Sequence, residues 1–225
     1  MFNKQASMKL YSVDNEKDLR LAITGKRSAI TNEEINTIFE YLEVFDNPVY
    51  AEVGVYFGGT FSKVLSYLHA NKQQYWAHGF DLFEDLQDET FGVNQTHDIK
   101  NKWNILNVAF KAELEESLKN KSFDNFTLYK GCSDEKINKT KMDVDLVLID
   151  GNHTYKQVKL DFEALLKKCK KGSIIVFDNS SNNIEPDPRY VALDGGPWKF
   201  CEELKKDSRV KHAKKIHRCT FFSVN

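Results

Sequence analysis

Short β-rich runs alternate with amphipathic helical patterns along most of this 225-residue chain, and this order restricts the fold more than any other feature. The spacing of apolar residues predicts strands at Val49–Val53, Tyr75–Phe80, Phe126–Tyr129, Val144–Ile149 and Ile174–Phe177, followed by a hairpin of Val210–Ala213 and Ile216–Val224. Helical spacing predicts helices over Ile35–Phe45, Phe61–Leu68, Trp103–Leu118, Tyr155–Cys169 and Trp198–Leu204. Strands that alternate with helices favour a parallel sheet that is covered on both faces.

The predicted fold class is therefore α/β. We expect a Rossmann-like, doubly wound, mostly parallel seven-stranded sheet with an antiparallel C-terminal hairpin and helices on both faces. Thr31 and Glu34 form a capping-box pattern, which predicts that the first helix begins there. We expect residues 1–30 to form an N-terminal arm or lid and residues 31–225 to form one domain.

Composition narrows the classes of function. The 32 Lys and Arg residues nearly balance the 33 Asp and Glu residues, and a net charge of -1 argues against a protein that mainly grips nucleic acid. The four scattered cysteines, without a C-x-x-C pair, indicate reduced thiols. No apolar run approaches the length of a membrane span, so we expect a soluble, cytoplasmic protein without a membrane partner. Assembly into a homo-oligomer stays open.

Acidic residues stand at the C-terminal ends of four predicted strands, namely Glu52, Asp81, Asp150 and Asp178. In an open α/β sheet, ligands bind at the edge where the parallel strands end. Four acids in the same relative position therefore predict a site along that edge, whereas a single one would be an ordinary loop residue.

The first of these strand ends leads into a glycine-rich turn, Glu52-Val-Gly54-Val-Tyr-Phe-Gly58-Gly59-Thr60. Gly54 can leave the strand sharply, Gly58 allows a ligand to approach the main chain, and Thr60 can cap the next helix. The spacing is not the G-x-G-x-x-G of dinucleotide-binding proteins, and no Gly-Lys-Ser/Thr of a phosphate-binding loop follows. A tight connection without a ligand is the structural alternative.

This motif, with Asp81 at the next strand end, resembles the S-adenosylmethionine (SAM) site of class I methyltransferases. The chain is most similar to the catechol O-methyltransferase-like group and to sugar and natural-product O-methyltransferases, roughly over residues 49–179. The resemblance implies that SAM is the cofactor and that the methyl acceptor is a hydroxyl of a small molecule or sugar. The cofactor-binding residues that it implies are Glu52, Gly54, Tyr56, Gly58, Thr60, Asp81, Cys132, Ser133 and Asp150.

The roles within this set also follow from the resemblance. Gly54 and the turn after it would pass beside the methionine part of SAM, and Glu52 would contact the amino group directly or through the loop. Asp81 would accept from the ribose hydroxyls, which a carboxylate can do for two donors at once. The segment Gly131–Asp134 is similar to the adenine-binding segment of the family.

A second group of polar residues comprises Asp150, His153, Asp178 and Asn179. Two neighbouring parallel strands that end at Asp150 and Asp178 would bring three oxygen ligands together with Asn179, a set that suits Mg²⁺. The resemblance implies the same metal ligands and places His153 where the family carries its base, usually a lysine. A bound metal would lower the pKa of the acceptor hydroxyl. Asp150 would stand beside His153 in the catalytic pair.

Alternatives remain for each of these assignments. Asp150 to His153 could form only a strand-to-helix turn with Asn152 or Thr154 as its cap, and Asp178-Asn179 could shape a turn without a metal. The same scaffold has also been adapted to oxidative iron chemistry. For the whole protein, the alternatives are a nicotinamide-dependent oxidoreductase and a catalytically silent SAM-binding module.

Two further segments have no specific signature. The acceptor pocket would be built from the N-terminal arm, residues 82–100 and residues 179–198. The run Lys205–Arg218 holds seven basic residues and one acid. It could attract an acidic acceptor, although solvated lysines that protect an edge strand explain it at least as well.

Overall fold

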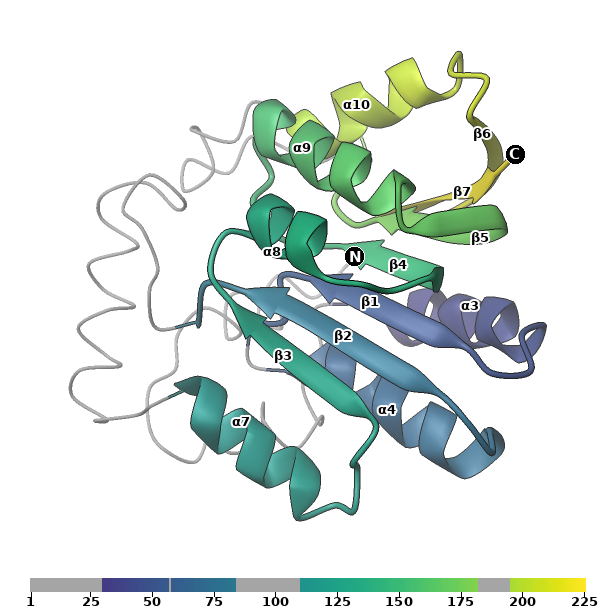
Figure 1. The fold of residues 1–225 in the computed structure, drawn as a ribbon. Helices are drawn as coiled ribbons and strands as arrows, with labels where there is room; N and C mark the ends of the chain where they lie inside the picture. The colour runs from purple at the N-terminus through teal and green to yellow at the C-terminus, as the bar shows by residue number, and fades with distance from the viewer. Residues whose placement is uncertain (1–29, 57, 84–109, 182–194) are drawn as a thin grey trace, which may run out of the picture.

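The computed structural model describes residues 30–56, 58–83, 110–181 and 195–225, and they form one α/β unit (Figure 1). Seven strands lie in one sheet in the order β3-β2-β1-β4-β5-β7-β6. The first five pair in parallel, whereas β7 pairs antiparallel with both β5 and β6. The predicted fold class, including the antiparallel C-terminal hairpin, is confirmed.

The strands are β1 (Val49–Val53), β2 (Trp76–Asp81), β3 (Phe126–Lys130), β4 (Val144–Ile149), β5 (Cys169–Phe177), β6 (Val210–Ile216) and β7 (Cys219–Val224). The described helices are α3 (Asn32–Glu43), α4 (Gly59–Asn71), α7 (Phe110–Lys119), α8 (Ser133–Lys139), α9 (Tyr155–Leu166) and α10 (Gly196–Leu204). None of the helices in the described ranges is both long and apolar enough to cross a bilayer.

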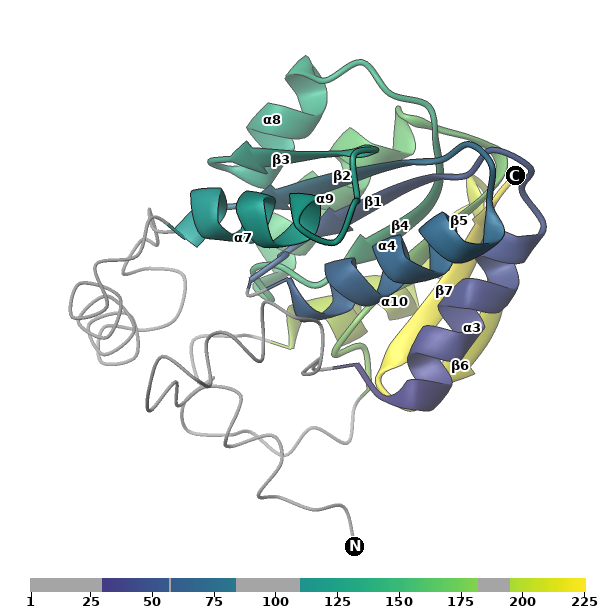
Figure 2. The same ribbon diagram turned by 90° about the horizontal axis from the view of Figure 1, so that it is seen from below.

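The sheet separates two hydrophobic cores. Helices α3, α4 and α7 cover one face and α8, α9 and α10 cover the other (Figure 2). Side chains of a strand alternate between the faces, so Leu146 and Leu148 of β4 join the first core while Val147 and Ile149 join the second. All four are fully or almost fully buried, which explains the continuous apolar run that identified β4 in the sequence.

Local signals place the first helix as predicted. Thr31 Oγ1 accepts from the backbone N–H of Glu34 at 3.2 Å, and Glu34 Oε2 accepts from the backbone N–H of Thr31 at 2.8 Å. This reciprocal capping box satisfies two of the amides that an α-helix leaves without partners at its start. Thr154 likewise caps α9 by accepting from the backbone N–H of Gln157, so that alternative for Thr154 is correct.

Two predicted boundaries are wrong, and one helix was not predicted. The helix expected to reach Cys169 ends at Leu166, because β5 begins at Cys169 and pairs with Val144 across an irregularity in the register. Ile216 belongs to β6 and not to β7, because it pairs with Cys219 at the tight end of the hairpin. Helix α8 was not predicted, since its seven residues contribute a single buried apolar side chain, Ile137.

Other predictions fall outside the described residues. They include residues 103–109 of the long helix, most of the predicted acceptor pocket and nearly all of the N-terminal arm. The division into an arm at residues 1–30 and a domain at residues 31–225 therefore stays a prediction.

Candidate active site

The C-terminal ends of β2, β1, β4 and β5 form one continuous edge. Val53 lies opposite both Phe80 and Ile149, and Ile149 lies opposite Phe177. Backbone hydrogen bonds continue one step further, from the N–H of Gly54 to Phe80, of Asp150 to Val53 and of Asp178 to Ile149. The residues that follow in this row are Gly54, Asp81, Asp150 and Asp178. The predicted alignment is present for Asp81, Asp150 and Asp178, whereas Glu52, which was predicted with them, lies inside β1 opposite Gly79 and Leu148.

Gly54 is the point at which the two halves of this edge touch. Its φ is +85°, a backbone conformation that residues other than glycine rarely adopt. A Cβ at this position would lie 2.0 Å from the backbone oxygen of Asp150. Only glycine therefore allows the turn after β1 to pass so close to the turn after β4.

Asp81 organises the loops on either side of it. Its Oδ2 accepts from the backbone N–H of Tyr56 at 2.7 Å and its Oδ1 accepts from that of Phe83 at 2.6 Å. Tyr56 and Phe83 both have φ values of 50°, so these strained positions are held by the same carboxylate. Since each carboxylate oxygen can accept more than one hydrogen bond, the arrangement is compatible with the predicted ribose contact.

Three further residues of the motif, Glu52, Gly58 and Thr60, are placed as follows. Gly58, with φ of 74°, is the N-cap of α4, so Thr60 lies inside the first turn and does not cap it as predicted. Glu52 is 1% exposed and accepts from the Tyr50 hydroxyl at 2.6 Å. Burial raises the pKa of Glu52 well above its ordinary value, although the Tyr50 hydrogen bond opposes this.

The predicted adenine segment begins α8. Cys132 is the exposed N-cap residue, and its side chain makes no capping hydrogen bond. Ser133 Oγ donates to Asp161 Oδ1 on α9 at 2.6 Å, and Gln157 Nε2 donates to the same oxygen at 3.0 Å. Burial raises the pKa of Asp161 to about 7, although these two hydrogen bonds oppose it. Asp161 and Gln157 were not among the predicted residues.

His153 lies between the two strand ends. Its Nε2 is 3.4 Å from Asp150 Oδ1, and the Asn179 amide nitrogen is 3.3 Å from its Nδ1 and 3.4 Å from its Nε2. Nε2 is the ring nitrogen that faces Asp150, and the Asn179 amide lies at nearly the same distance from both ring nitrogens. In the tautomer that carries its proton on Nε2, Nδ1 can accept from Asn179. The structure thus brings Asp150, His153 and Asn179 together.

The two strand-end acids influence each other. Burial and then the charge of Asp178 raise the pKa of Asp150 to about 7, and the contact with His153 opposes this rise. Asp178 itself is 1% exposed. Repulsion between these two carboxylates is relieved by a proton on Asp150 or by a positive charge nearby, since unpaired buried charges are strongly unfavourable.

Arg218 supplies that charge and was not predicted as a site residue. Its Nη2 is 3.3 Å from Asp178 Oδ2, and its Nη1 donates to Asn179 Oδ1 at 3.2 Å. The predicted Mg²⁺ would use the same Asp178 carboxylate and the single amide oxygen of Asn179. Because a guanidinium already faces both, the residues in this arrangement do not fit a divalent cation.

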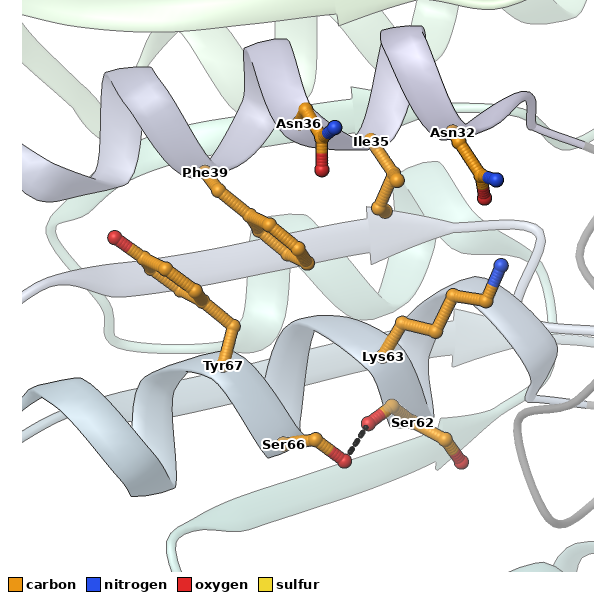
Figure 3. A pocket seen from close by; sticks show the side chains of 8 residues that line it. All are labelled: Asn32, Ile35, Asn36, Phe39, Ser62, Lys63, Ser66 and Tyr67. Atoms are coloured by element: carbon orange, nitrogen blue, oxygen red, sulfur yellow. Dashed lines mark hydrogen bonds between the residues drawn. The ribbon is translucent and has the colours of Figure 1, made fainter.

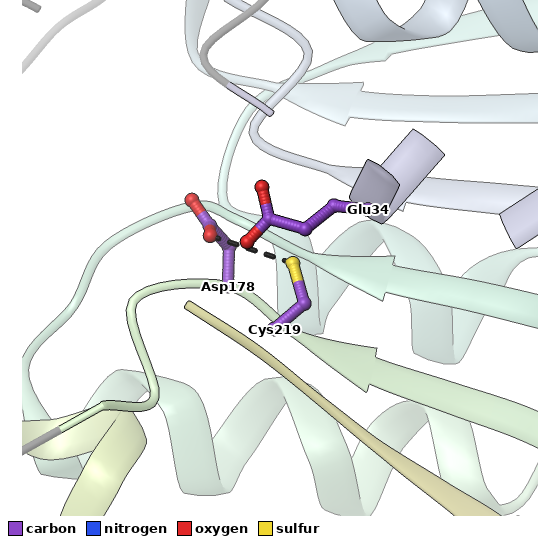
Figure 4. A group of neighbouring side chains, drawn as sticks. All are labelled: Glu34, Asp178 and Cys219. Atoms are coloured by element: carbon purple, nitrogen blue, oxygen red, sulfur yellow. Dashed lines mark hydrogen bonds between the residues drawn. The ribbon is translucent and has the colours of Figure 1, made fainter. Parts of the chain in front are cut away.

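Asp178 also belongs to a second cluster of side chains that could ligate a metal. Glu34, Asp178 and Cys219 place ligand atoms within 4.8 Å of one another, and all three are buried (Figure 4). Cys219 Sγ donates to Asp178 Oδ1 at 3.6 Å, and Glu34 Oε1 accepts from the backbone N–H of Arg218 at 2.8 Å. Each member thus has a protein partner in the neighbourhood of Arg218. Asp178 Oδ2 accepts no hydrogen bond in the described part of the chain, and the cation that faces it there is the Arg218 guanidinium at 3.3 Å.

A cavity of about 430 Å³ lies elsewhere, between α3 and α4. Figure 3 shows Phe39 and Tyr67 stacked across it, with ring centroids 4.3 Å apart. None of the predicted site residues lines this cavity, so it lies apart from the strand-end site.

The sequence alone could not identify Arg218 as a site residue, because its position depends on the register between β5 and β7. Phe177 lies opposite Thr220, and the N–H of Ser180 donates to the carbonyl of Arg218 at 2.8 Å. This antiparallel pairing sets Arg218 beside Asn179. From the sequence, the basic residues of Lys205–Arg218 were expected to face solvent or to attract an acidic acceptor. Arg218 instead contacts Asp178 and Asn179 within the site.

Solved structures of other proteins share the fold described above. The O-methyltransferase TomG from Streptomyces achromogenes, solved with SAM, superposes with a TM-score of 0.64 at 14% identity, covering 100% of this chain and 99% of that one. An O-methyltransferase from Bacillus cereus, solved with S-adenosylhomocysteine (SAH), gives a TM-score of 0.57 at 13% identity, with 100% and 93% covered. No curated protein sequence matches the chain significantly.

The methyltransferase MycE of the mycinamycin pathway, solved with Mg, SAH and mycinamycin VI, gives a TM-score of 0.54 at 13% identity. It covers 92% of this chain and 53% of its own length. At such identities these likenesses show the fold. Together with the site, the fold defines the class, a SAM-dependent methyltransferase.

A family model described as a methyltransferase domain matches residues 51–180. The match spans more than half of the chain, and the chain belongs to this methyltransferase family. The resemblance to class I O-methyltransferases that the sequence motif indicated is confirmed.

Proposed function

We propose that this chain transfers the methyl group of SAM to a hydroxyl of a small molecule or sugar. The observation that carries this proposal is the position of His153, which lies between Asp150 and Asn179 at the strand-end edge. Gly54 brings the glycine-rich turn against the backbone of Asp150 at the same edge. A cofactor site and a base are therefore expected side by side.

The cofactor would lie along the first half of the edge. The turn from Gly54 to Thr60 would pass beside its methionine part, Asp81 would accept from the ribose hydroxyls, and Cys132 and Ser133 would flank the adenine. The bound SAM of TomG and the bound SAH of the Bacillus cereus enzyme, which share the fold, support this proposal. Glu52 is so deeply buried that a contact with the amino group would require the turn above it to shift.

His153 would act as the base. SAM supplies a methyl group on a positively charged sulfur, which an oxygen nucleophile attacks in line. The imidazole nitrogen away from Asp150 would accept the hydroxyl proton of the acceptor, while Asp150 keeps the proton on the other nitrogen and orients the ring. Asn179 would yield its contact with the ring to the incoming hydroxyl.

The predicted magnesium at Asp150, Asp178 and Asn179 stays a prediction. If bound there, it would lower the pKa of the acceptor hydroxyl. MycE was solved with Mg. In this chain, Arg218 contacts both Asp178 and Asn179, which favours its guanidinium over a metal ion as the cation at this place. The proposed proton transfer to His153 needs no metal.

The expected setting is the cytoplasm, with a small hydroxylated molecule as the partner. All four cysteines are free, which supports a reducing compartment. We propose neither a nucleic acid nor a membrane as partner, and the oligomeric state is left to measurement.

The proposal is tested by titrating the purified protein with SAM, SAH and NAD in a calorimeter. SAM and SAH should bind with one site per chain, and NAD should not. Binding of NAD alone would instead support the oxidoreductase alternative. Transfer of a labelled methyl group from SAM to a panel of phenols, sugars and hydroxylated natural products would then identify the acceptor class.

A further inference from the structure

Arg218 occupies the turn between β6 and β7, 39 residues beyond the Asn179 that it contacts. Its backbone is fixed from two directions. Its carbonyl accepts from the N–H and the hydroxyl of Ser180, both at 2.8 Å, and its N–H donates to Glu34 Oε1 at 2.8 Å. Glu34 is also the partner of the N-cap residue Thr31 in the capping box of α3, so the arginine is positioned by elements from three parts of the chain.

The guanidinium is held in acidic surroundings. Asp178, Asp150 and Glu34 are the carboxylates whose charges act on it, and the Cys219 thiol lies beside Asp178. Although burial opposes its charge, these neighbours raise the pKa of Arg218 above its ordinary value. Arginine is charged at every physiological pH, so the site holds a permanent cation.

The hydrogen bond from Arg218 also fixes the orientation of Asn179. An amide has an oxygen that accepts and a nitrogen that donates. Because Asn179 Oδ1 faces Arg218 Nη1 at 3.2 Å, its Nδ2 is turned toward the ring of His153. The arginine therefore acts on the proposed base through the asparagine.

We propose that the Arg218 guanidinium is the resident cation of this site in place of a divalent ion, so that methyl transfer by this chain needs no metal. The inference rests on the methyl transfer proposed above. Arg218 is in this view a positioning residue, which balances the charge of Asp178 and orients Asn179 toward His153. Without the guanidinium, Asp150, Asp178 and Asn179 would be free to bind a divalent ion.

The test measures binding of Mn²⁺, a probe for sites of oxygen ligands, by electron paramagnetic resonance. The wild-type protein, dialysed against a chelator, should bind no Mn²⁺ at this site. Arg218→Met should bind Mn²⁺ at least about 100-fold more tightly, because it removes a positive charge that repels the ion at close range. The double variant Arg218→Met/Asp178→Asn should lose this binding again.

Arg209→Met is the matched control. Arg209 also forms ion pairs, at 2.8 Å with Glu163 of α9 and at 2.7 Å with Asp207, but Arg209 and Asp207 lie in the exposed connection between α10 and β6. Its loss should create no Mn²⁺ binding. If Arg218→Met does not fold, Arg218→Gln provides the same test with an uncharged side chain that can still form hydrogen bonds.

Two results would overturn the inference. One is stoichiometric Mn²⁺ binding by the wild-type protein, with methyl transfer that a chelator abolishes. The other is a folded Arg218→Met or Arg218→Gln variant that gains no Mn²⁺ binding. If neither variant folds, the wild-type titration alone decides between a site that admits a divalent ion and one that does not.

A second readout separates a positioning role from a purely structural one. Arg218→Lys retains the charge and should retain part of the turnover, whereas Arg218→Met should lower kcat while the KM for SAM stays close to that of the wild type. SAM binding is measured on the same samples. If SAM does not bind, the proposed function fails, and the metal-binding result still stands by itself.

Discussion

The strand-end edge has two halves that are built in different ways. The cofactor half, which comprises residues 54–60, Asp81 and Ser133, is organised mainly by backbone geometry, as in the two amides held by Asp81. The acceptor half comprises Asp150, His153, Asp178, Asn179 and Arg218. It is held by contacts between buried and partly buried polar side chains from distant segments. The first half is therefore readable from a local motif, whereas the second depends on which strands become neighbours.

The largest expected effect comes from the point where the halves touch. In Gly54→Ala, the new Cβ would lie 2.0 Å from a backbone oxygen that cannot move away without displacing β4. We expect loss of SAM binding and of cooperative thermal unfolding, measured by calorimetry. Gly172→Ala is the matched control, since Gly172 has φ of 88° but no atom within 4 Å of the added Cβ.

The control should pay only the conformational strain of an alanine at positive φ, about 1–2 kcal/mol, and should still bind SAM. Equal behaviour of the two variants would contradict the view that Gly54 is required for close contact between the halves.

The next effect is confined to the acceptor half. In His153→Ala, methyl transfer should fall by about 100- to 10,000-fold, the usual contribution of a general base, while the affinity for SAM changes little. Turnover with labelled SAM and calorimetry on the same preparation measure the two quantities. His212→Ala, an exposed histidine of β6, is the control.

Unchanged turnover in His153→Ala would remove this residue from the mechanism. If SAM still bound and the biological output were also unchanged, the result would favour the silent SAM-binding module.

A smaller effect should be confined to the cofactor half. In Asp81→Asn, one of the two backbone amides that the carboxylate now accepts would face an amide donor. We expect the Kd for SAM to rise by about 10- to 100-fold, the cost of one buried donor without a partner. At saturating SAM, kcat should approach that of the wild type. A large fall in kcat with unchanged SAM affinity would show that the two halves are not separable.

The smallest effect is a change in the pH dependence of stability. Burial raises the pKa of Asp161 from 3.8 to about 7. Between these values the folded state keeps a proton that the unfolded state has lost, so the free energy of unfolding falls as the pH rises toward 7. Asp161→Asn removes this contribution and should be more stable than the wild type at pH 8, by about 1–3 kcal/mol, but not at pH 4.

Chemical denaturation at both pH values measures this difference. Glu163→Gln on the same helix is the control of opposite sign, because hydrogen bonds from Arg209 lower the pKa of Glu163. Its contribution is present above the unfolded pKa and is lost at low pH, so the variant should be slightly less stable than the wild type at pH 8. A wild-type-like profile for Asp161→Asn would mean that Asp161 is not protonated at pH 5 to 6.

Much of the fold could be predicted because its signals are local. These signals include the capping box at Thr31 and Glu34, the β-rich runs and the acids near their ends. Each depends only on residues that are close together in the sequence. The boundary at Cys169 could not, because the strand extends there only through pairing with Val144. Helix α8 carries too few buried residues to leave a periodic signal.

The sequence by itself determined that Asp81, Asp150 and Asp178 share one edge, since parallel strands align their C-terminal ends. It placed Glu52 there as well, but Glu52 lies inside β1. Only the tertiary structure decided which positively charged side chain lies near Asp150 and Asp178. Arg218 reaches Asp178 through the antiparallel register of β5 and β7, and Glu34 reaches the same place through the packing of α3. Such contacts join residues that are far apart in the chain. They form because a buried carboxylate is unfavourable unless a positive charge or a hydrogen-bond donor faces it.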